Sequence, residues 1–419
     1  MFHIDRIIVL FTTRSIMRRI PVIKVFFRKR KRERRPPNRP FVSPMVLATT
    51  AIGVLMMLYA RWDLVVMPHA ENHLLGTPNN KNLQVEGSET SQAVEKTPAD
   101  HERQAREDQE AYCQALVAAT NDTDADSHPH GTRPAAVSVT HHAAVPYGGK
   151  PFSILAYMSH DVVSNSLRAG GWDSSKTNAL LKHLSKYAEQ HKVPFSDLTF
   201  IDIGANVGWF TLAVASLGIK VIAIEPMDDN LHLLRRSLCA PENGNFSSNV
   251  ILHATAVSST AQTCVTYSDV GNFGDGLLHC DSNEQELAHF VPPPRYFVRG
   301  GPLRTVRLDD IVPVDRAIAA VKMDTEGHEA SILRGGKRTL LERRVPAIWS
   351  EFNAEWIIET GEDPRMFLKA FFDAGYTVQR ESGEVLSSEY ALNMTHWRGI
   401  NDIVFIFKGK DKVRGLRLR

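Results

Sequence analysis

Cysteine is scarce in this sequence, which has four in 419 residues: Cys113, Cys239, Cys264 and Cys280. None of them stands in a C-x-x-C or C-x-x-H spacing, and this argues against a zinc site. Three of them lie close together in the C-terminal half, where an oxidising compartment would allow one disulfide among them. The sequence does not choose the pair.

An excess of charge of one sign is also missing, since the formal net charge is only +2. Positive charge is concentrated in the block Lys24–Arg39, which holds nine Lys or Arg residues against the single acid Glu33. The rest of the chain shows no basic patch interleaved with aromatic residues, the pattern typical of nucleic-acid binding. We therefore expect no nucleic-acid partner.

One long run lacks charge altogether. Phe41–Ala60 is apolar, and no charged residue lies between Arg39 and Arg61. About 20 apolar residues suffice to cross the hydrocarbon core of a bilayer, so the run predicts a transmembrane helix in contact with lipid. A buried core helix is the alternative, but it would show a polar stripe, and none is visible.

The position of the basic block predicts the orientation of this helix. Because the cationic residues precede the apolar run, residues 1–40 are expected in the cytosol and the C-terminal bulk in the lumen of the Golgi or endoplasmic reticulum. The chain would then be a single-pass type II membrane protein with a signal anchor. The Arg-rich, acid-poor segment Met1–Arg35 favours a mitochondrial address as the alternative. On the lumenal side the N-glycosylation triplets at Asn121, Asn245 and Asn393 could be modified if exposed.

Residues 61–150 are predicted to form a largely disordered stem. Glu71–Tyr147 is polar and has no sustained apolar period, so it cannot bury enough surface to offset the entropy of ordering. Glu102–Ala118 is the exception and could form one short helix. The folded domain is expected over residues 151–410.

In that domain strand and helix signals alternate. This pattern predicts the α/β class with a doubly wound, mostly parallel sheet. An irregular stretch rich in Gly and Pro, Gly271–Gly301, interrupts it. The expected strands are Leu198–Ile203, Lys220–Ile224, Val250–Val257, Cys264–Tyr267, Leu303–Leu308, Ala319–Met323, Ala347–Phe352, Tyr376–Gln379 and Ile403–Phe407, and the expected helices are Thr211–Leu217, Asp229–Leu238, Glu329–Arg343 and Asp363–Ala374.

The turn after the first of these strands carries the most informative motif, Phe200–Phe210 with the letters FIDIGANVGWF. Gly204 permits a sharp turn and Gly208 opens the next helix, as in nucleotide-binding α/β folds. The G-x-G-x-x-G of dinucleotide folds is absent, and Asp202 would repel a phosphate. That carboxylate suits a cationic, phosphate-free ligand such as S-adenosylmethionine. Glu225 ends the second strand, where a carboxylate can accept ribose hydroxyls.

Four blocks taken together resemble the FkbM family of methyltransferases. They are FIDIGANVGWF, VIAIEP, TVRLDD and VKMDTEGHE, followed by ILRGG and a strand that ends in SEF. The resemblance implies a Rossmann-like methyltransferase fold that uses S-adenosyl-L-methionine, usually to methylate a hydroxyl oxygen. Two features depart from the family pattern: His328 stands where a small residue is frequent, and Gly271–Gly301 makes the substrate side harder to transfer.

Candidate site residues follow from these motifs. For the cofactor we expect contacts from the strand ends and the glycine turn, with Asp202 at the methionine end and Glu225 at the ribose. The Asn206 side chain could equally close its own turn. The cofactor-binding candidates are Asp202, Gly204, Ala205, Asn206, Gly208, Glu225 and Asp324.

The catalytic candidates are Asp324, Glu326 and His328, because an alcohol nucleophile benefits from a nearby base. Each has another interpretation: Asp324 could bind the cofactor's amino group, Glu326 could stabilise a helix start, and His328 could be an ordinary hydrogen-bonded histidine. Glu351 could join Asp324 and Glu326 around one cavity. Three acids could hold Mg²⁺ or form a polar lining, and we assign no metal. Asp309 and Asp310 are expected to cap the segment that follows them.

The sequence thus predicts a membrane-anchored methyltransferase acting on a hydroxyl of a carbohydrate or another small acceptor. A non-catalytic scaffold on the same fold is the first alternative, and a nicotinamide-dependent oxidoreductase, disfavoured by the missing glycine motif, is the second.

Overall fold

The computed structural model describes residues 96–119, 136–141, 145–281 and 283–409. They belong to one compact unit, Ser91–Arg419. The basic segment, the apolar run Phe41–Ala60 and Asn121 lie outside the described residues. Within the described residues, no helix combines the length and the apolar character needed to cross a membrane.

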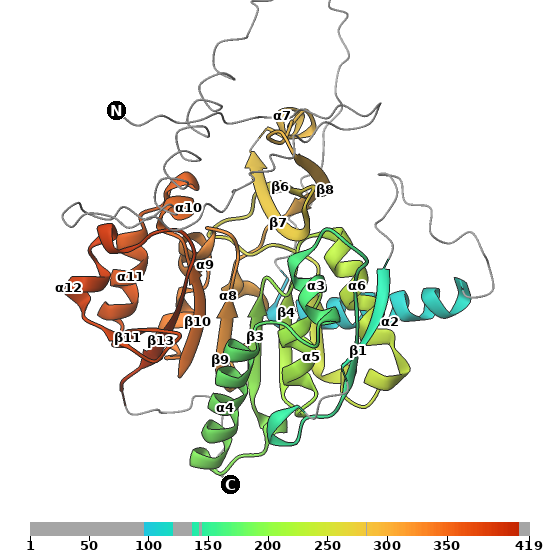
Figure 1. Ribbon diagram of the computed structural model, residues 1–419, viewed down its shortest axis with the longest axis horizontal. Coiled ribbons are helices and arrows are strands. Elements are labelled where there is room, and N and C mark those ends of the chain that lie inside the picture. The colour runs from blue at the N-terminus through green and yellow to red at the C-terminus, as the bar shows by residue number, and fades with distance from the viewer. Residues whose placement is uncertain (1–95, 120–135, 142–144, 282, 410–419) are drawn as a thin grey trace, which may run out of the picture. The chain divides into compact units, whose positions relative to one another are not determined.

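A large mixed sheet forms the centre of the described part (Figure 1). Its eight strands follow the order β12-β11-β13-β10-β9-β3-β4-β5. The five strands from β10 to β5 are parallel, and β13 pairs antiparallel with both β10 and β11. The expected α/β class with a mostly parallel sheet is confirmed. The bounds are β3 Thr199–Ile203, β4 Lys220–Ile224, β5 Val250–His253, β9 Ile318–Met323, β10 Ala347–Phe352, β11 Tyr376–Arg380, β12 Val385–Leu386 and β13 Asn401–Phe407.

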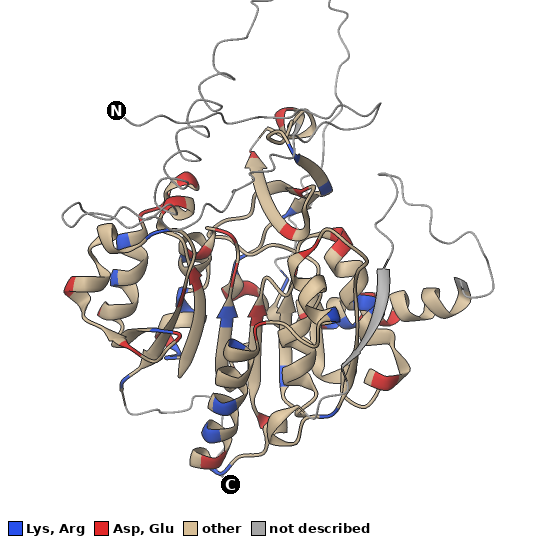
Figure 2. Ribbon diagram, in the orientation of Figure 1, with Lys and Arg blue, Asp and Glu red and all other residues tan. Residues whose placement is uncertain are grey.

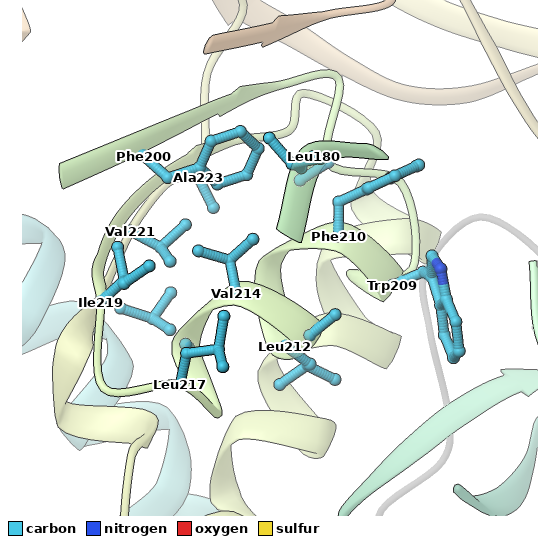
Figure 3. Packing of buried hydrophobic residues seen from close by; sticks show 14 of the residues in the cluster. Leu180, Phe200, Trp209, Phe210, Leu212, Val214, Leu217, Ile219, Val221 and Ala223 are labelled. Atoms are coloured by element: carbon cyan, nitrogen blue, oxygen red, sulfur yellow. The ribbon is translucent and has the colours of Figure 1, made fainter. Parts of the chain in front are cut away.

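Helices cover both faces of this sheet, because its strands are apolar on both sides. Phe200 and Val221 point into one core cluster, whereas their neighbours Ile201 and Ile222 point into the other. This alternation follows from the two-residue period of a strand. Figure 3 shows the first cluster, in which Phe200, Val221 and Ala223 of the sheet pack with Val214 and Leu217.

The first cluster lies under α4 Ser174–His191, α5 Trp209–Ala215, α6 Asp228–Cys239 and the strand β2 Phe152–Tyr157. The second lies under α2 Pro98–Ala119, α8 Leu308–Ile311, α9 Glu329–Gly335, α10 Ala354–Glu359, α11 Pro364–Asp373 and α12 Ser388–Ala391. Further elements are β1 Ala136–His141, α3 Val162–Arg168, the 3₁₀ turns Pro146–Gly148, Phe195–Asp197, Pro241–Asn243, Ser247–Asn249 and Met394–His396, and a π-helical segment Arg338–Glu342.

The strand β3 marks the point where the sheet changes winding direction. It pairs with β4 on one side and with β9 on the other, and β9 comes far later in the chain. In open α/β sheets ligands bind at such a switch point, outside the carboxyl ends of the strands. The glycine motif follows β3 directly.

A second, three-stranded sheet corrects the prediction for Gly271–Gly301. This stretch was expected to be irregular, but most of it forms β7 Asn272–Asp281, α7 Glu284–Ala288 and β8 Tyr296–Arg304. The strands β7 and β8 pair with β6 Thr263–Asp269 on its two sides. Most residues of β7 are half-buried without alternation, so no strand period is visible in the sequence. Figure 1 shows this small sheet beyond the end of the main sheet. A disulfide joins Cys264 and Cys280 across β6 and β7.

The N-terminal limit of the folded unit also differs from the prediction. The helix expected over Glu102–Ala118 is present as α2, but it is no isolated element of a stem. It packs against β5, α6 and α8, and the disulfide Cys113–Cys239 ties it to α6. β1 pairs with β2 as well. Residues 98–119 and 136–141 therefore belong to the domain that was expected to begin at 151.

Two elements around Asp309 were predicted wrongly. Residues 303–308 were expected to form a strand, but β8 ends at Arg304 and α8 begins at Leu308. The helix expected over Glu329–Arg343 breaks after α9. The Asp309 carboxylate accepts hydrogen bonds from the amides of Arg338 and Thr339, so it caps this distant segment and not the one that follows it.

Candidate functional site

The glycine turn brings the ends of β3 and β9 into contact. Gly204 has a φ of +76°, and a Cβ atom there would lie 2.0 Å from the carbonyl oxygen of Asp324. Gly208 has a φ of +95° and packs against Leu234, which a Cβ atom would approach to 2.3 Å. Both positions therefore require glycine for conformation and for space.

Glu225 holds this turn in place. One of its carboxylate oxygens accepts a hydrogen bond from the amide of Asn206 at 2.7 Å, and the other accepts one from the amide of Met227 at 2.9 Å. Burial raises the pKa of Glu225 to about 7, against the opposing effect of these hydrogen bonds. The Asn206 side chain accepts from the amide of Val207 and donates to the carbonyl of Gly274 in β7. These hydrogen bonds give the Asn206 side chain the turn-closing role that the sequence offered as the alternative to a cofactor contact.

Asp202 lies behind the site and not in it. Its side chain is fully buried, and its Oδ2 accepts a hydrogen bond from Thr211 at 2.7 Å. Its Oδ1 lies 3.6 Å from Nζ of Lys322. Asp202 is absent from the residues that line the cavity described below, so the expected direct contact with the methionine end of a cofactor is not what this geometry offers.

Lys322 is the centre of charge in this region, and sequence reasoning missed it. It is buried, donates to the carbonyl of Gly204 at 2.9 Å, and lies 3.5 Å from Oδ2 of Asp324. The nearby carboxylates of Asp324 and Asp202 outweigh burial and raise the pKa of Lys322. The signal in the sequence was a lone lysine inside an apolar strand.

A cavity of about 520 Å³ opens at the carboxyl ends of β3, β4, β9 and β10. Figure 2 shows acidic segments near these ends, on the side of the small sheet. Of the predicted site residues the cavity is lined by Gly204, Ala205, Asn206, Glu225, Asp324, Glu326 and His328, and by the metal candidate Glu351, but not by Asp202 or Gly208.

Three acids gather on one side of the cavity, as the sequence suggested. One carboxylate oxygen of each of Asp324, Glu326 and Glu351 lies within 4.8 Å of the others. Burial and the neighbouring carboxylates raise the pKa of Glu326 to about 11 and that of Glu351 to about 9. Glu326 also hydrogen-bonds Asp275 of β7, whose pKa is raised by burial.

His328 lines the same cavity beside β7. Burial lowers the pKa of its imidazole, against a hydrogen bond to the Leu278 backbone that raises it. The neutral ring is thus favoured, and a neutral imidazole can accept a proton.

Residues that the sequence did not single out also line the cavity. Asp161, at the start of α3, accepts the amide of Gly274 at 2.9 Å and lines the cavity beside Asp275. Lys176 of α4 lies 2.6 Å from Asp402 of β13, and both line the cavity. These side chains come from segments far apart in the chain, so no local motif could have identified them.

The fold and the cavity define an α/β protein with a cavity at the carboxyl ends of its parallel strands. Comparison by sequence finds that residues 202–378 match the methyltransferase FkbM domain. The resemblance stated from the motifs is confirmed over that segment.

Solved structures of methyltransferases are similar to this chain at low identity. The methyltransferase FkbM from Methylobacillus flagellatus KT is 17% identical, with a TM-score of 0.29, over 56% of this chain and 56% of that chain. The precorrin-6y C5,15-methyltransferase from Geobacter metallireducens GS-15 is 16% identical, with a TM-score of 0.27, over 54% and 87%. The bifunctional kinase-methyltransferase WbdD is 11% identical, with a TM-score of 0.31, over 58% and 41%. At these values the likenesses carry no argument about activity. No curated protein matches the chain.

Proposed function

We propose that this chain is an S-adenosyl-L-methionine-dependent O-methyltransferase whose acceptor is a hydroxyl of a carbohydrate or another small molecule. The observation that carries the proposal is the cavity at the switch point of an FkbM-type domain, which is lined by Glu225 and the glycine turn and by Asp324 and His328. Cofactor and acceptor groups would thus meet in one enclosed space.

The residues present fit this cofactor. Apolar side chains of Ile224, Val257 and Ile332 line the cavity around the end of β4 and suit an adenine ring. The buried carboxylate of Glu225 accepts hydrogen bonds from the backbone amides of Asn206 and Met227 and from the Asn230 side chain, and it keeps a lone pair for the ribose hydroxyls. Asp324 has a side chain 33% exposed to the cavity side and suits the cofactor's ammonium group. S-adenosylmethionine supplies an electrophilic methyl group when bound.

The chain's own residues then have two tasks, to hold the acceptor hydroxyl and to take its proton. Asp324 and His328 are the two candidates for the base, and both line the cavity. The variants Asp324→Asn and His328→Gln separate their roles. Loss of kcat with an unchanged cofactor Kd marks the base, whereas a raised cofactor Kd marks the ammonium contact.

The membrane anchor and the lumenal location form part of the proposal. They rest on the apolar run Phe41–Ala60 and the preceding basic block. The disulfides Cys113–Cys239 and Cys264–Cys280 support an oxidising compartment. Mitochondrial targeting is the alternative.

Titration calorimetry tests the central claim. The chain is expected to bind S-adenosylmethionine and its demethylated product, and not NADH. Absence of cofactor binding at near-millimolar ligand would exclude the methyltransferase and leave the scaffold. An untargeted search for methylated products in cells with and without the protein would then identify the acceptor.

A further inference from the structure

The three acids on one wall of the cavity come from two neighbouring strands and a strained turn. Glu351 ends β10 and lies beside Asp324, which follows the end of β9, because Ser350 and Met323 are partners in the parallel pair. Glu326 has a φ of +54°, a conformation that costs a non-glycine residue free energy. The turn therefore places a third carboxyl group beside the other two.

Glu351 provides an independent observation that points to a ligand. Its side chain is more than nine-tenths buried, with an exposed fraction of 7%, and it lines the cavity. Its Oε2 has no hydrogen-bond partner among the described residues. A buried acceptor without a partner costs about 1–3 kcal/mol, and more when it is charged.

Lys176 and Lys322 do not supply the missing partner of Glu351 Oε2, because other groups engage both. Nζ of Lys176 is engaged by Asp173 at 3.1 Å and by Asp402 at 2.6 Å. Nζ of Lys322 donates to the carbonyl of Gly204 and lies between Asp202 and Asp324.

We propose that Asp324, Glu326 and Glu351 bind a divalent metal ion of the hard, oxygen-preferring class, such as Mg²⁺ or Mn²⁺. One oxygen of each lies within 4.8 Å of the other two, so a single ion can reach all three. Carboxylate oxygens are the ligands that these ions prefer, and Mg²⁺ commonly keeps further positions for water or substrate. Those positions would face the cavity.

The chemical role of the ion rests on the proposed function. An acceptor hydroxyl that coordinates a divalent cation loses its proton more readily, since the cation stabilises the alkoxide. A molecule with two adjacent hydroxyls could occupy two coordination positions, and this favours a polyhydroxylated acceptor.

The test measures metal binding directly, without methyl transfer. The full chain in detergent, stripped with EDTA, is titrated with MnCl₂ while free Mn²⁺ is counted by electron paramagnetic resonance. We expect one Mn²⁺ per chain. Glu351→Gln should weaken binding at least about tenfold. The matched control is Glu355→Gln, the same change at an exposed residue of α10 outside the cavity, and it should bind as the unchanged chain does.

Thermal unfolding gives a second, independent measurement of metal binding. Mn²⁺ should raise the Tm of the unchanged chain and of Glu355→Gln, but not that of Glu351→Gln. If Glu351→Gln does not fold, Glu326→Gln takes its place. Absence of stoichiometric binding, or unchanged binding by the cavity variant, overturns the proposal and leaves a proton-sharing acid cluster. A chain that binds cofactor but no Mn²⁺ overturns this inference alone, whereas one that binds Mn²⁺ but no cofactor overturns the methyltransferase.

Discussion

At the residue scale, Glu225 links the cofactor site to pH. Burial raises its pKa to about 7, so one pH unit lower only about a tenth of it is ionised. The protonated carboxyl offers a weaker acceptor to ribose hydroxyls. We therefore predict that cofactor affinity falls about tenfold between pH 8 and pH 6. Calorimetry at each pH measures it, and Glu225→Gln should bind weakly with a flat pH profile. A sloping profile in that variant would assign the titration to another group.

The raised pKa of Glu225 also affects the stability of the fold, which it should lower, not raise, as the pH increases. The folded pKa of Glu225, about 7, lies above the ordinary value of 4.5, so the folded state binds the proton more tightly than the unfolded state. The stabilisation that this proton gives is present below pH 4.5 and is lost as the pH rises towards 7. The proposed cofactor would therefore bind best at a pH where the free protein has lost this stabilisation.

Gly204 carries a prediction of its own. Gly204→Ala places a methyl group against the carbonyl of Asp324, 2.0 Å away, in a backbone with a φ of +76°. The control is Gly218→Ala, with a φ of +87° and nothing within 4 Å of the added atom. We expect the control to lose about 1 kcal/mol from conformational strain and Gly204→Ala about 3 kcal/mol or more, together with cofactor binding. Urea unfolding measures both, and equal losses would show that the turn can shift away from β9.

At the element scale, α2 is held to the sheet by packing and by a disulfide. Cys113–Cys239 closes a loop with a sequence separation of 126, whereas Cys264–Cys280 closes one of 16. In the chain-entropy account the longer loop stabilises more, by about 5 against about 3 kcal/mol. We predict that replacing the first pair by alanine lowers the free energy of unfolding more than replacing the second, as measured by urea titration. The reverse order would mean that the buried Cys264 contributes mainly through packing.

Local signals predicted some elements of this domain and not others. The runs Lys220–Ile224 and Ala347–Phe352 were predicted with the bounds that β4 and β10 have, because buried parallel strands are continuous apolar runs. β7 and β8 were missed because half-exposed strands of a small sheet carry no clear period. α2 was found as a helix, but nothing in its sequence could show that it docks on β5.

The sequence likewise predicted some residues of the candidate site and missed others. Gly204, Glu225 and Asp324 were expected at the site because each stands at or just after the carboxyl end of a strand within a recognisable motif, and all three line the cavity. Lys322 and Asp275 were missed, because their importance depends on neighbours that the fold brings from elsewhere. The position of Asp202 was predicted wrongly, because its strand points that side chain towards Thr211 of α5 and away from the cavity.

At the scale of the whole molecule, the compartment decides which acceptors the enzyme could meet. The proposed topology places residues 91–419 in the secretory lumen, where disulfides persist and glycans are built. Both disulfides, Cys113–Cys239 and Cys264–Cys280, lie within that unit. A cytosol-facing or mitochondrial domain would meet other acceptors.

N-glycosylation provides the test of this topology. Asn245 is exposed, between α6 and β5, and its triplet continues through Phe246 to Ser247. Asn393 is exposed too, but its side chain accepts two hydrogen bonds from Thr395. We therefore expect modification at Asn245 in preference to Asn393 if the domain is lumenal. After expression in a eukaryotic cell, glycosidase treatment should increase gel mobility. In a chain whose Asn121 is also replaced by Gln, Asn245→Gln should remove most of the remaining shift. Protease added to intact microsomes should leave the C-terminal domain undigested. If no triplet is modified and the domain is digested, the lumenal topology is wrong, because both assays report the side of the membrane on which the domain lies.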